Sequence, residues 1–149
     1  MDRSYVRGLT ITIAAVFTFS GALLLDAQQP RPTVFTTEQA EAGRVAYAKH
    51  CASCHMPDLT GDNERPPLVG TGFMTTWGGR STKEFLAYMT GAMPYGGPAL
   101  DAEAYASLTA YILQSNGASA GSEVLGASTD VSIGSVTATR PGSTISGKD

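Results

Sequence analysis

The two cysteines of the chain, Cys51 and Cys54, are followed directly by His55, one of its two histidines. Together they form a C-x-x-C-H motif, the attachment signature of c-type haem. Two thiols at this spacing on a helical turn can add to the two vinyl groups along one edge of a porphyrin. The next residue can then present its imidazole to the iron. The motif therefore predicts one haem c, covalently attached through Cys51 and Cys54, with His55 as an iron ligand.

Two other uses of a cysteine pair find no support in the sequence. A thioredoxin-like redox pair requires a βαβ context, which is absent around Cys51 and Cys54. A zinc site would need further ligands, and only His50 and His55 remain. Both histidines lie too close to the cysteines to form a separate ligand arm. The haem interpretation is therefore preferred to either.

Helical patterns surround the motif, and nothing between them alternates like a strand. Thr36 with Gln39 forms a capping box that begins one helix, and residues 81–84 form a second capping box. A third helix begins near Asp101 and ends at residues 116–117. We expect an all-α domain over residues 36–116, with three to four helices. Long loops are expected over 56–79 and 92–99.

Composition and charge exclude several classes of protein. The chain has 149 residues, of which 42% are hydrophobic, and a net charge of −3. The hydrophobic fraction is too high for a wholly disordered chain. A pI near 5.3 argues against nucleic acid as a partner.

The two ends differ in composition from the central domain. Residues 1–27 combine Arg3 and Arg7 with an uncharged apolar run, which predicts a signal peptide or an N-terminal membrane anchor. Either would place the domain on the periplasmic side of the membrane. Residues 28–35 are predicted to be a linker. Residues 117–149, rich in Ser, Gly, Thr and Ala, are predicted to be a disordered tail.

With these features the sequence resembles the class I c-type cytochromes over most of residues 36–117. In that family a helix with a glycine and an aromatic crosses one with a leucine and an aromatic. Gly43 and Tyr47 are similar to the first pair, and Leu108 and Tyr111 to the second. The resemblance implies a cytochrome c fold, with helices and long loops wrapped around one haem.

The same resemblance suggests roles for two further residues. Residues 66–70, Pro-Pro-Leu-Val-Gly, are similar to the family's proline loop, which implies that the Pro66 carbonyl accepts a hydrogen bond from the His55 ring. Trp77 would line the pocket, with Trp77 or Arg80 close to a haem propionate. A simple proline turn and a solvated arginine are the alternatives at these positions.

The second axial ligand is predicted to be a methionine. Met56 and His50 lie beside the attachment motif, and Met89 belongs to a helical apolar stripe typical of a core residue. Met74, in the first long loop, is a distant candidate. Met93 lies in a loop and precedes a proline, like the axial methionine of the family. We therefore expect His55 and Met93 to ligate the iron.

These features predict a one-electron carrier of a periplasmic or membrane-associated chain, and not an enzyme. Its partners would be redox proteins, such as a dehydrogenase, an oxidase or a reaction-centre type complex. Since residues 36–116 carry five basic and eight acidic side chains, docking should be mainly hydrophobic around the haem edge. The alternatives are a permanently anchored subunit of a membrane complex and an open-site haem enzyme or gas sensor.

Overall fold

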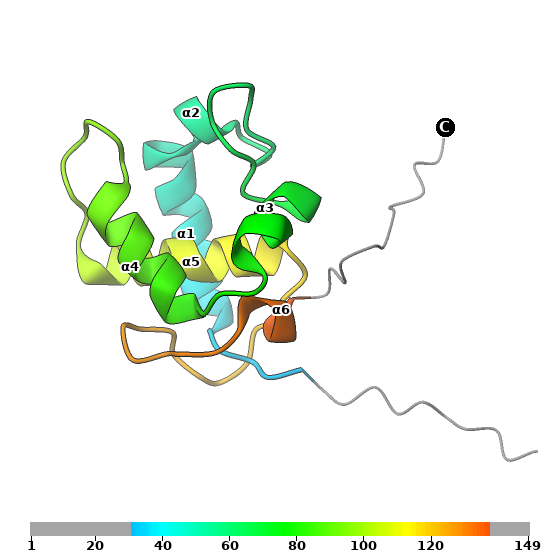
Figure 1. Ribbon diagram of the computed structural model, residues 1–149. Helices are drawn as coiled ribbons and strands as arrows, with labels where there is room; N and C mark the ends of the chain where they lie inside the picture. Colours follow the sequence, from blue (N-terminus) through cyan, green and yellow to red (C-terminus); the bar gives the residue numbers. More distant parts are fainter. Residues whose placement is uncertain (1–30, 138–149) are drawn as a thin grey trace, which may run out of the picture.

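The computed structural model describes residues 31–137, in which six helices and no β-strand are present (Figure 1). In chain order the helices are α1 (Thr37–His50), α2 (Ala52–His55), α3 (Gly70–Trp77), α4 (Thr82–Ala92), α5 (Ala102–Ser115) and α6 (Ile133–Val136). The all-α prediction is therefore confirmed. The three predicted helices correspond to α1, α4 and α5.

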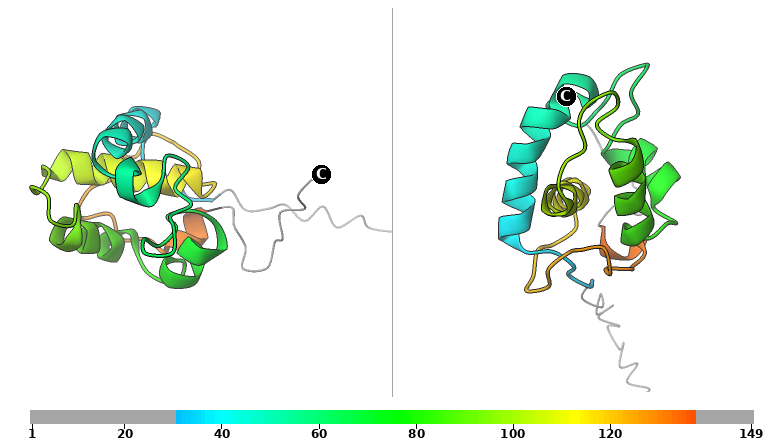
Figure 2. Two further views of the ribbon diagram at one scale, coloured as in Figure 1. Left: turned by 90° about the horizontal axis from the view of Figure 1, so that it is seen from above. Right: turned by 90° about the vertical axis from the view of Figure 1, so that its left-hand side faces the viewer.

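The crossing of α1 and α5 organises the core. The right-hand view of Figure 2 shows α5 end-on beside the upright α1. Gly43 makes this approach possible, because a Cβ atom there would lie 1.9 Å from the Ser107 carbonyl oxygen. Next to it, the rings of Tyr47 and Tyr111 pack with their centroids 5.5 Å apart. These contacts place the end of α1, and so the cysteine motif, over α5.

The helix starts follow the local sequence. The Thr36 hydroxyl accepts a hydrogen bond from the backbone amide of Gln39. In return, the side-chain oxygen of Gln39 accepts one from the backbone amide of Thr36. The same reciprocal capping box, between Ser81 and Glu84, begins α4. The Asp101 carboxylate accepts from the amide of Ala104 at the start of α5.

The prediction of a loop over residues 56–79 is wrong in its second half, where α3 forms. Glycine and threonine give this segment low helix propensity, so its residue types do not predict a helix. Tertiary packing offsets that cost, because Phe73, Met74 and Trp77 are all buried. Their spacing along one helical face is the signal that could have identified the helix.

The predicted linker and tail are also wrong where the structure describes them. Val34 and Phe35 lie in the core, and the Phe35 carbonyl accepts from the Gly121 amide at 2.8 Å. Beyond α5, Leu125, Ile133 and Val136 are 2% exposed or less. These apolar residues are too widely spaced to show a period, so composition alone suggested disorder.

The predicted signal or anchor over 1–27 lies outside the described residues, as do residues 138–149. Within residues 31–137, no helix is both long enough and apolar enough to cross a bilayer.

Candidate functional site

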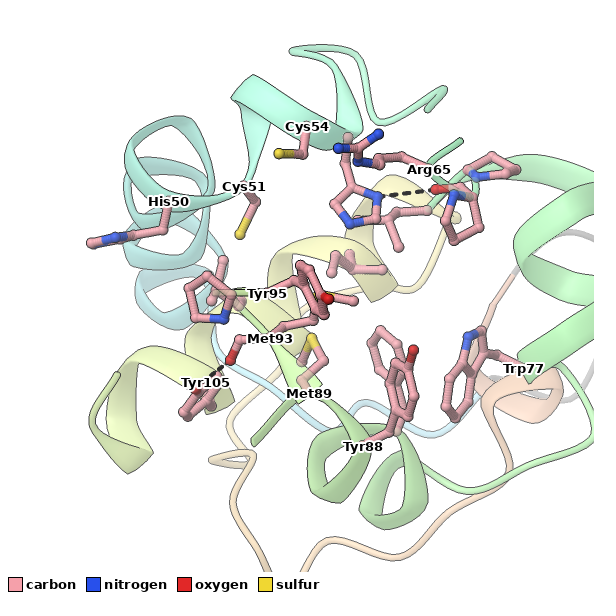
Figure 3. Close-up of a pocket in the computed structure, with 18 of the residues that line it drawn as sticks. His50, Cys51, Cys54, Arg65, Trp77, Tyr88, Met89, Met93, Tyr95 and Tyr105 are labelled. Atoms are coloured by element: carbon pink, nitrogen blue, oxygen red, sulfur yellow. Dashed lines mark hydrogen bonds between the residues drawn. The ribbon is translucent and has the colours of Figure 1, made fainter. Parts of the chain in front are cut away.

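A cavity of about 770 Å³ lies between the α1–α2 corner, the 64–68 loop, α4 and α5. Its volume falls in the range of about 300–1,000 Å³ that is usual for small-molecule and cofactor sites. Its lining includes all six predicted site residues, which are Cys51, Cys54, His55, Pro66, Trp77 and Met93. Residues separated by more than forty positions in the sequence therefore meet around one space (Figure 3).

The attachment motif lies on the short helix α2. The Cys54 and His55 amides both donate to the Cys51 carbonyl, at 3.1 and 2.9 Å. This turn brings both thiols to the cavity (Figure 3). Burial raises the pKa of the Cys51 thiol to about 11, with a smaller contribution from nearby Cys54.

The side chain of Tyr47 is hydrogen-bonded to the backbone at the end of this turn. Its hydroxyl donates to the carbonyls of His55 and Met56, at 3.1 and 2.7 Å. Burial raises the pKa of Tyr47, so the hydroxyl keeps its proton and remains a donor. Tyr47 thus links the α1–α5 crossing to the motif.

The His55 ring is oriented as the family resemblance implied. His55 Nδ1 lies 3.0 Å from the Pro66 carbonyl oxygen. Since a carbonyl only accepts, Nδ1 carries the proton in this contact and Nε2 is the nitrogen left for a metal. His55 itself is 8% exposed, so its ring is held inside the protein.

A compact turn positions the Pro66 carbonyl. The Asp62 carboxylate accepts from the amides of Glu64 and Arg65, at 2.8 and 2.7 Å. These bonds lower the pKa of Asp62. Gly61 has φ +64°, and a Cβ atom there would lie 2.3 Å from the Arg65 carbonyl oxygen. Neither residue was predicted to matter, although Gly-Asp is a recognisable turn pair.

Asn116 anchors the other end of the same loop. Its side-chain oxygen accepts from the Gly70 amide at 3.0 Å, and its nitrogen donates to the Leu68 carbonyl at 2.9 Å. The local sequence identifies Asn116 only as part of a helix end. Its role in bracing the proline loop comes from a contact across 46 positions, which no local pattern indicates.

Two methionines line the cavity from the α4 end. Met93 follows α4 directly, and its carbonyl accepts from the Tyr105 hydroxyl at 2.6 Å (Figure 3). The same hydroxyl accepts from the Leu100 amide at 3.2 Å, which ties both ends of the loop to α5. Met89 is 7% exposed, as expected of a core residue, yet it also lines the cavity.

The other sulfur and histidine candidates are less well placed. Met74 is buried under the Thr137 hydroxyl, 3.6 Å from its sulfur, and Met56 is absent from the cavity lining. His50 lies at the cavity edge, and its ring is directed away from the centre (Figure 3).

An aromatic wall closes the α3–α4 side. Trp77 is 8% exposed, and its ring packs edge-on against Phe85 with centroids 4.7 Å apart. Tyr88 lies 5.1 Å from the indole, and the Arg80 guanidinium lies 4.9 Å over it. Trp77 is thus a buried aromatic that faces the cavity, with a cation beside it.

The residues around the cavity suit a haem. The lining combines two free thiols, an oriented imidazole, thioether sulfurs and an apolar floor that includes Leu108 and Ile112. Thiols would form the covalent links, and imidazole and thioether are the donor pair of c-type cytochromes. The apolar floor would accept the macrocycle.

Residues 38–112 match the family model described as cytochrome C oxidase, cbb3-type, subunit III. No curated protein and no solved structure gives a match. The match spans half of the chain, from the start of α1 to the cavity-facing part of α5, and includes the attachment motif, the proline loop and the Met93 loop. The chain therefore belongs to the cbb3-type cytochrome c family, as a class I c-type cytochrome whose domain serves haem-based electron transfer.

Proposed function

We propose that the protein is a one-electron carrier whose haem c is attached through Cys51 and Cys54 and ligated by His55 and Met93. One observation carries this proposal: the motif and the Met93 loop line the same cavity, from different ends of the domain. The haem supplies an iron(II)/iron(III) couple when bound. The polypeptide holds both ligands and keeps water away from the iron.

The hydrogen bonds around the ligands support this assignment. The Pro66 carbonyl, 3.0 Å from His55 Nδ1, fixes the ring and makes the imidazole a stronger donor. Methionine as the second ligand raises the reduction potential. With His55 and Met93 both holding the iron, the haem would offer no place for substrate, which favours a carrier over an enzyme.

An absorption spectrum of the purified protein tests the ligands. The oxidised form should show the weak near-infrared sulfur-to-iron band of a Met-ligated haem, and the reduced form should bind carbon monoxide slowly. The haem should also stay on the polypeptide through acidified organic extraction and denaturing electrophoresis. Rapid carbon monoxide binding without the sulfur band would contradict the closed carrier and favour the open-site alternative.

We further propose that the domain lies on the periplasmic side of the membrane. The support is the basic and apolar pattern of residues 1–27. Intact mass measurement of the native protein distinguishes the two forms of this proposal. A start near Gln28 indicates cleavage, and a start at Met1 indicates an anchor. Haem-loaded protein found only in the cytoplasm would contradict both.

A second candidate is a permanent subunit of a membrane complex. The printed description of the matched family, an oxidase subunit, favours it. In gently solubilised membranes a permanent subunit should co-purify with the complex at constant stoichiometry. A carrier should instead separate from it and reduce it in solution. In both cases an oxidase-type complex is the proposed electron acceptor.

A further inference from the structure

Residues 125–137, here called the C-terminal strap, lie against the turn between α3 and α4. The strap follows α5 and lies outside the matched family region. Its helix α6 sits beside α3, and the chain before it passes along the start of α4 (Figures 1 and 2). The turn that it contacts, residues 78–82, is here called the α3–α4 corner.

A ladder of hydrogen bonds joins the two segments. Three are backbone bonds of 2.9 Å: Thr82 N to Val131 O, Ile133 N to Arg80 O, and Gly134 N to Gly78 O. The Thr82 hydroxyl adds two more: it donates to the Thr129 carbonyl at 2.7 Å and accepts from the Val131 amide at 3.3 Å. Three backbone groups of the corner, the carbonyls of Gly78 and Arg80 and the amide of Thr82, are therefore paired with the strap.

Apolar packing holds the strap in place. Ile133 is fully buried, and Val136 is 1% exposed. At the end of the strap, the Thr137 hydroxyl donates to the Ile133 carbonyl at 3.1 Å and lies 3.6 Å from the Met74 sulfur of α3. The strap therefore contacts the structure on both sides of the corner.

Two groups that line the cavity lie at this corner, one directly before it and one within it. Trp77 ends α3, and Arg80 lies in the turn with its guanidinium 4.9 Å over the indole. Both line the proposed haem site. The backbone of Arg80 is itself bonded to the strap, because its carbonyl accepts from the Ile133 amide. Loosening the strap would thus release the backbone that positions the aromatic wall.

We propose that the C-terminal strap is a positioning element, which holds Trp77 and Arg80 against the haem and thereby keeps the reduction potential high. The proposal rests on the function proposed above. A closed wall excludes water, and water favours the more highly charged ferric state. The Arg80 cation also lines the site, and, although it is exposed and partly screened by water, it would further disfavour the ferric state. Displacing the corner should therefore lower the potential through both effects.

Two glycines of the strap provide a matched pair of variants. In Gly134→Ala the new Cβ atom would lie 2.8 Å from the Gly78 carbonyl oxygen, so the strap must shift away from the corner. In Gly126→Ala the new Cβ meets nothing within 4 Å. We expect Gly134→Ala to lower the midpoint potential and to change the near-ultraviolet circular dichroism of Trp77, the only tryptophan. Gly126→Ala should leave both unchanged.

A pair of threonines tests the same point with a smaller change. Thr82→Val removes the hydroxyl that bridges to the strap, whereas Thr90→Val removes one that bonds within α4, to Leu86 at 2.9 Å. Losing a hydrogen bond predicts roughly two- to tenfold faster exchange of the strap amides in Thr82→Val. The potential should fall in Thr82→Val and not in Thr90→Val.

The outcomes separate this proposal from the proposed function. If the unmutated protein shows no covalent haem or no sulfur-to-iron band, the proposed function fails. If those signatures are present and the strap amides exchange faster while the potential and the Trp77 signal stay constant, the strap is only a stabilising element. Unchanged amide exchange in both Gly134→Ala and Thr82→Val would also overturn the proposal.

Discussion

Tyr47 and Tyr105 each hold the backbone beside a proposed axial ligand. The Tyr47 hydroxyl is shared between the carbonyls of His55 and Met56, at 3.1 and 2.7 Å, and the Tyr105 hydroxyl donates to that of Met93, at 2.6 Å. Both rings are 2% exposed, so the phenol groups act as buried braces. A buried carbonyl that loses its donor costs about 1–3 kcal/mol, which makes such braces sensitive to substitution.

The Tyr105 brace predicts weaker methionine ligation in Tyr105→Phe. Loss of the bond to the Met93 carbonyl should free the loop and weaken the sulfur-to-iron band at elevated temperature. Tyr111→Phe, on the same helix, is the control, because its ring packs on Tyr47 and is not part of the cavity lining. Equal thermal loss of the band in both variants would argue against the brace.

Substituting the two methionines that line the cavity should show which one binds the iron and which one only packs in the core. Met93→Ala should abolish the sulfur-to-iron band, lower the potential and let the reduced protein bind carbon monoxide quickly. Met89→Ala should keep the band and cost about 2–5 kcal/mol of stability through a core cavity. Loss of the band in Met89→Ala alone would assign the ligand to Met89, which also lines the site.

Asp62 predicts an acid-sensitive turn near His55. Two backbone amides lower its pKa below the ordinary value of 3.8, so the folded state favours the charged form. Its contribution to stability is therefore complete above that value and is lost as the pH falls through the folded-state pKa. The Glu64 and Arg65 amide resonances of the reduced protein should report this titration, which Asp62→Ala should remove.

At the scale of elements, the crossing of α1 and α5 is the joint that supports the site. The two helices can approach closely because Gly43 has no side chain. A Cβ atom at Gly43 would lie 1.9 Å from the backbone carbonyl oxygen of Ser107, which is not a flexible side chain. Backbone cannot yield without moving a helix. The C-terminal end of α1 leads directly into the attachment motif. A shift of this crossing would therefore move Cys51 and His55 relative to the Met93 loop.

Gly43→Ala should therefore destabilise the protein strongly. Overpacking of a core typically costs about 1–3 kcal/mol and sometimes more. Gly91→Ala, in α4, is the matched control: the new Cβ meets nothing within 4 Å, and alanine favours helix by up to about 1 kcal/mol. Denaturant unfolding of the reduced haem protein measures both. Equal stability of the two variants would contradict the close crossing.

At the scale of the whole molecule, the packed unit extends past the matched family region at both ends. It begins at Val34, before α1, and includes α6, after α5. The Gln39 side chain, in the first turn of α1, donates to the Leu125 carbonyl at 2.9 Å and accepts from the Leu125 amide at 2.8 Å. In Figure 1, residues 31–36 lie at the opposite end of the molecule from α2. The added segments therefore support the core from the side away from the attachment motif.

A chain ending at Gly117 should be clearly less stable than one ending at Thr137. The shorter chain loses Leu125, Ile133 and Val136, each of which contributes about 1.5–3 kcal/mol when buried. The longer one keeps every contact described above. Thermal unfolding of the two haem proteins measures the difference. Equal unfolding temperatures would show that the strap adds nothing to the core.

The local sequence determined the chemistry and the main helices. The C-x-x-C-H spacing, both capping boxes and the Asp101 cap act over three or four positions, and all are present in the fold. The Pro66 contact with His55, implied by the family resemblance, is also present. Such features are predictable because neighbouring residues are held together by the chain itself.

Only the tertiary structure decided what surrounds that chemistry. It formed α3 from a segment of low helix propensity and showed that Met89 lines the cavity beside Met93. It also packed Ile133 and Val136 of the strap, which composition had suggested to be disordered. In each case the stabilising contact joins residues that lie far apart in the sequence. A local pattern carries no record of such partners, because their burial depends on surfaces that exist only after the chain has folded.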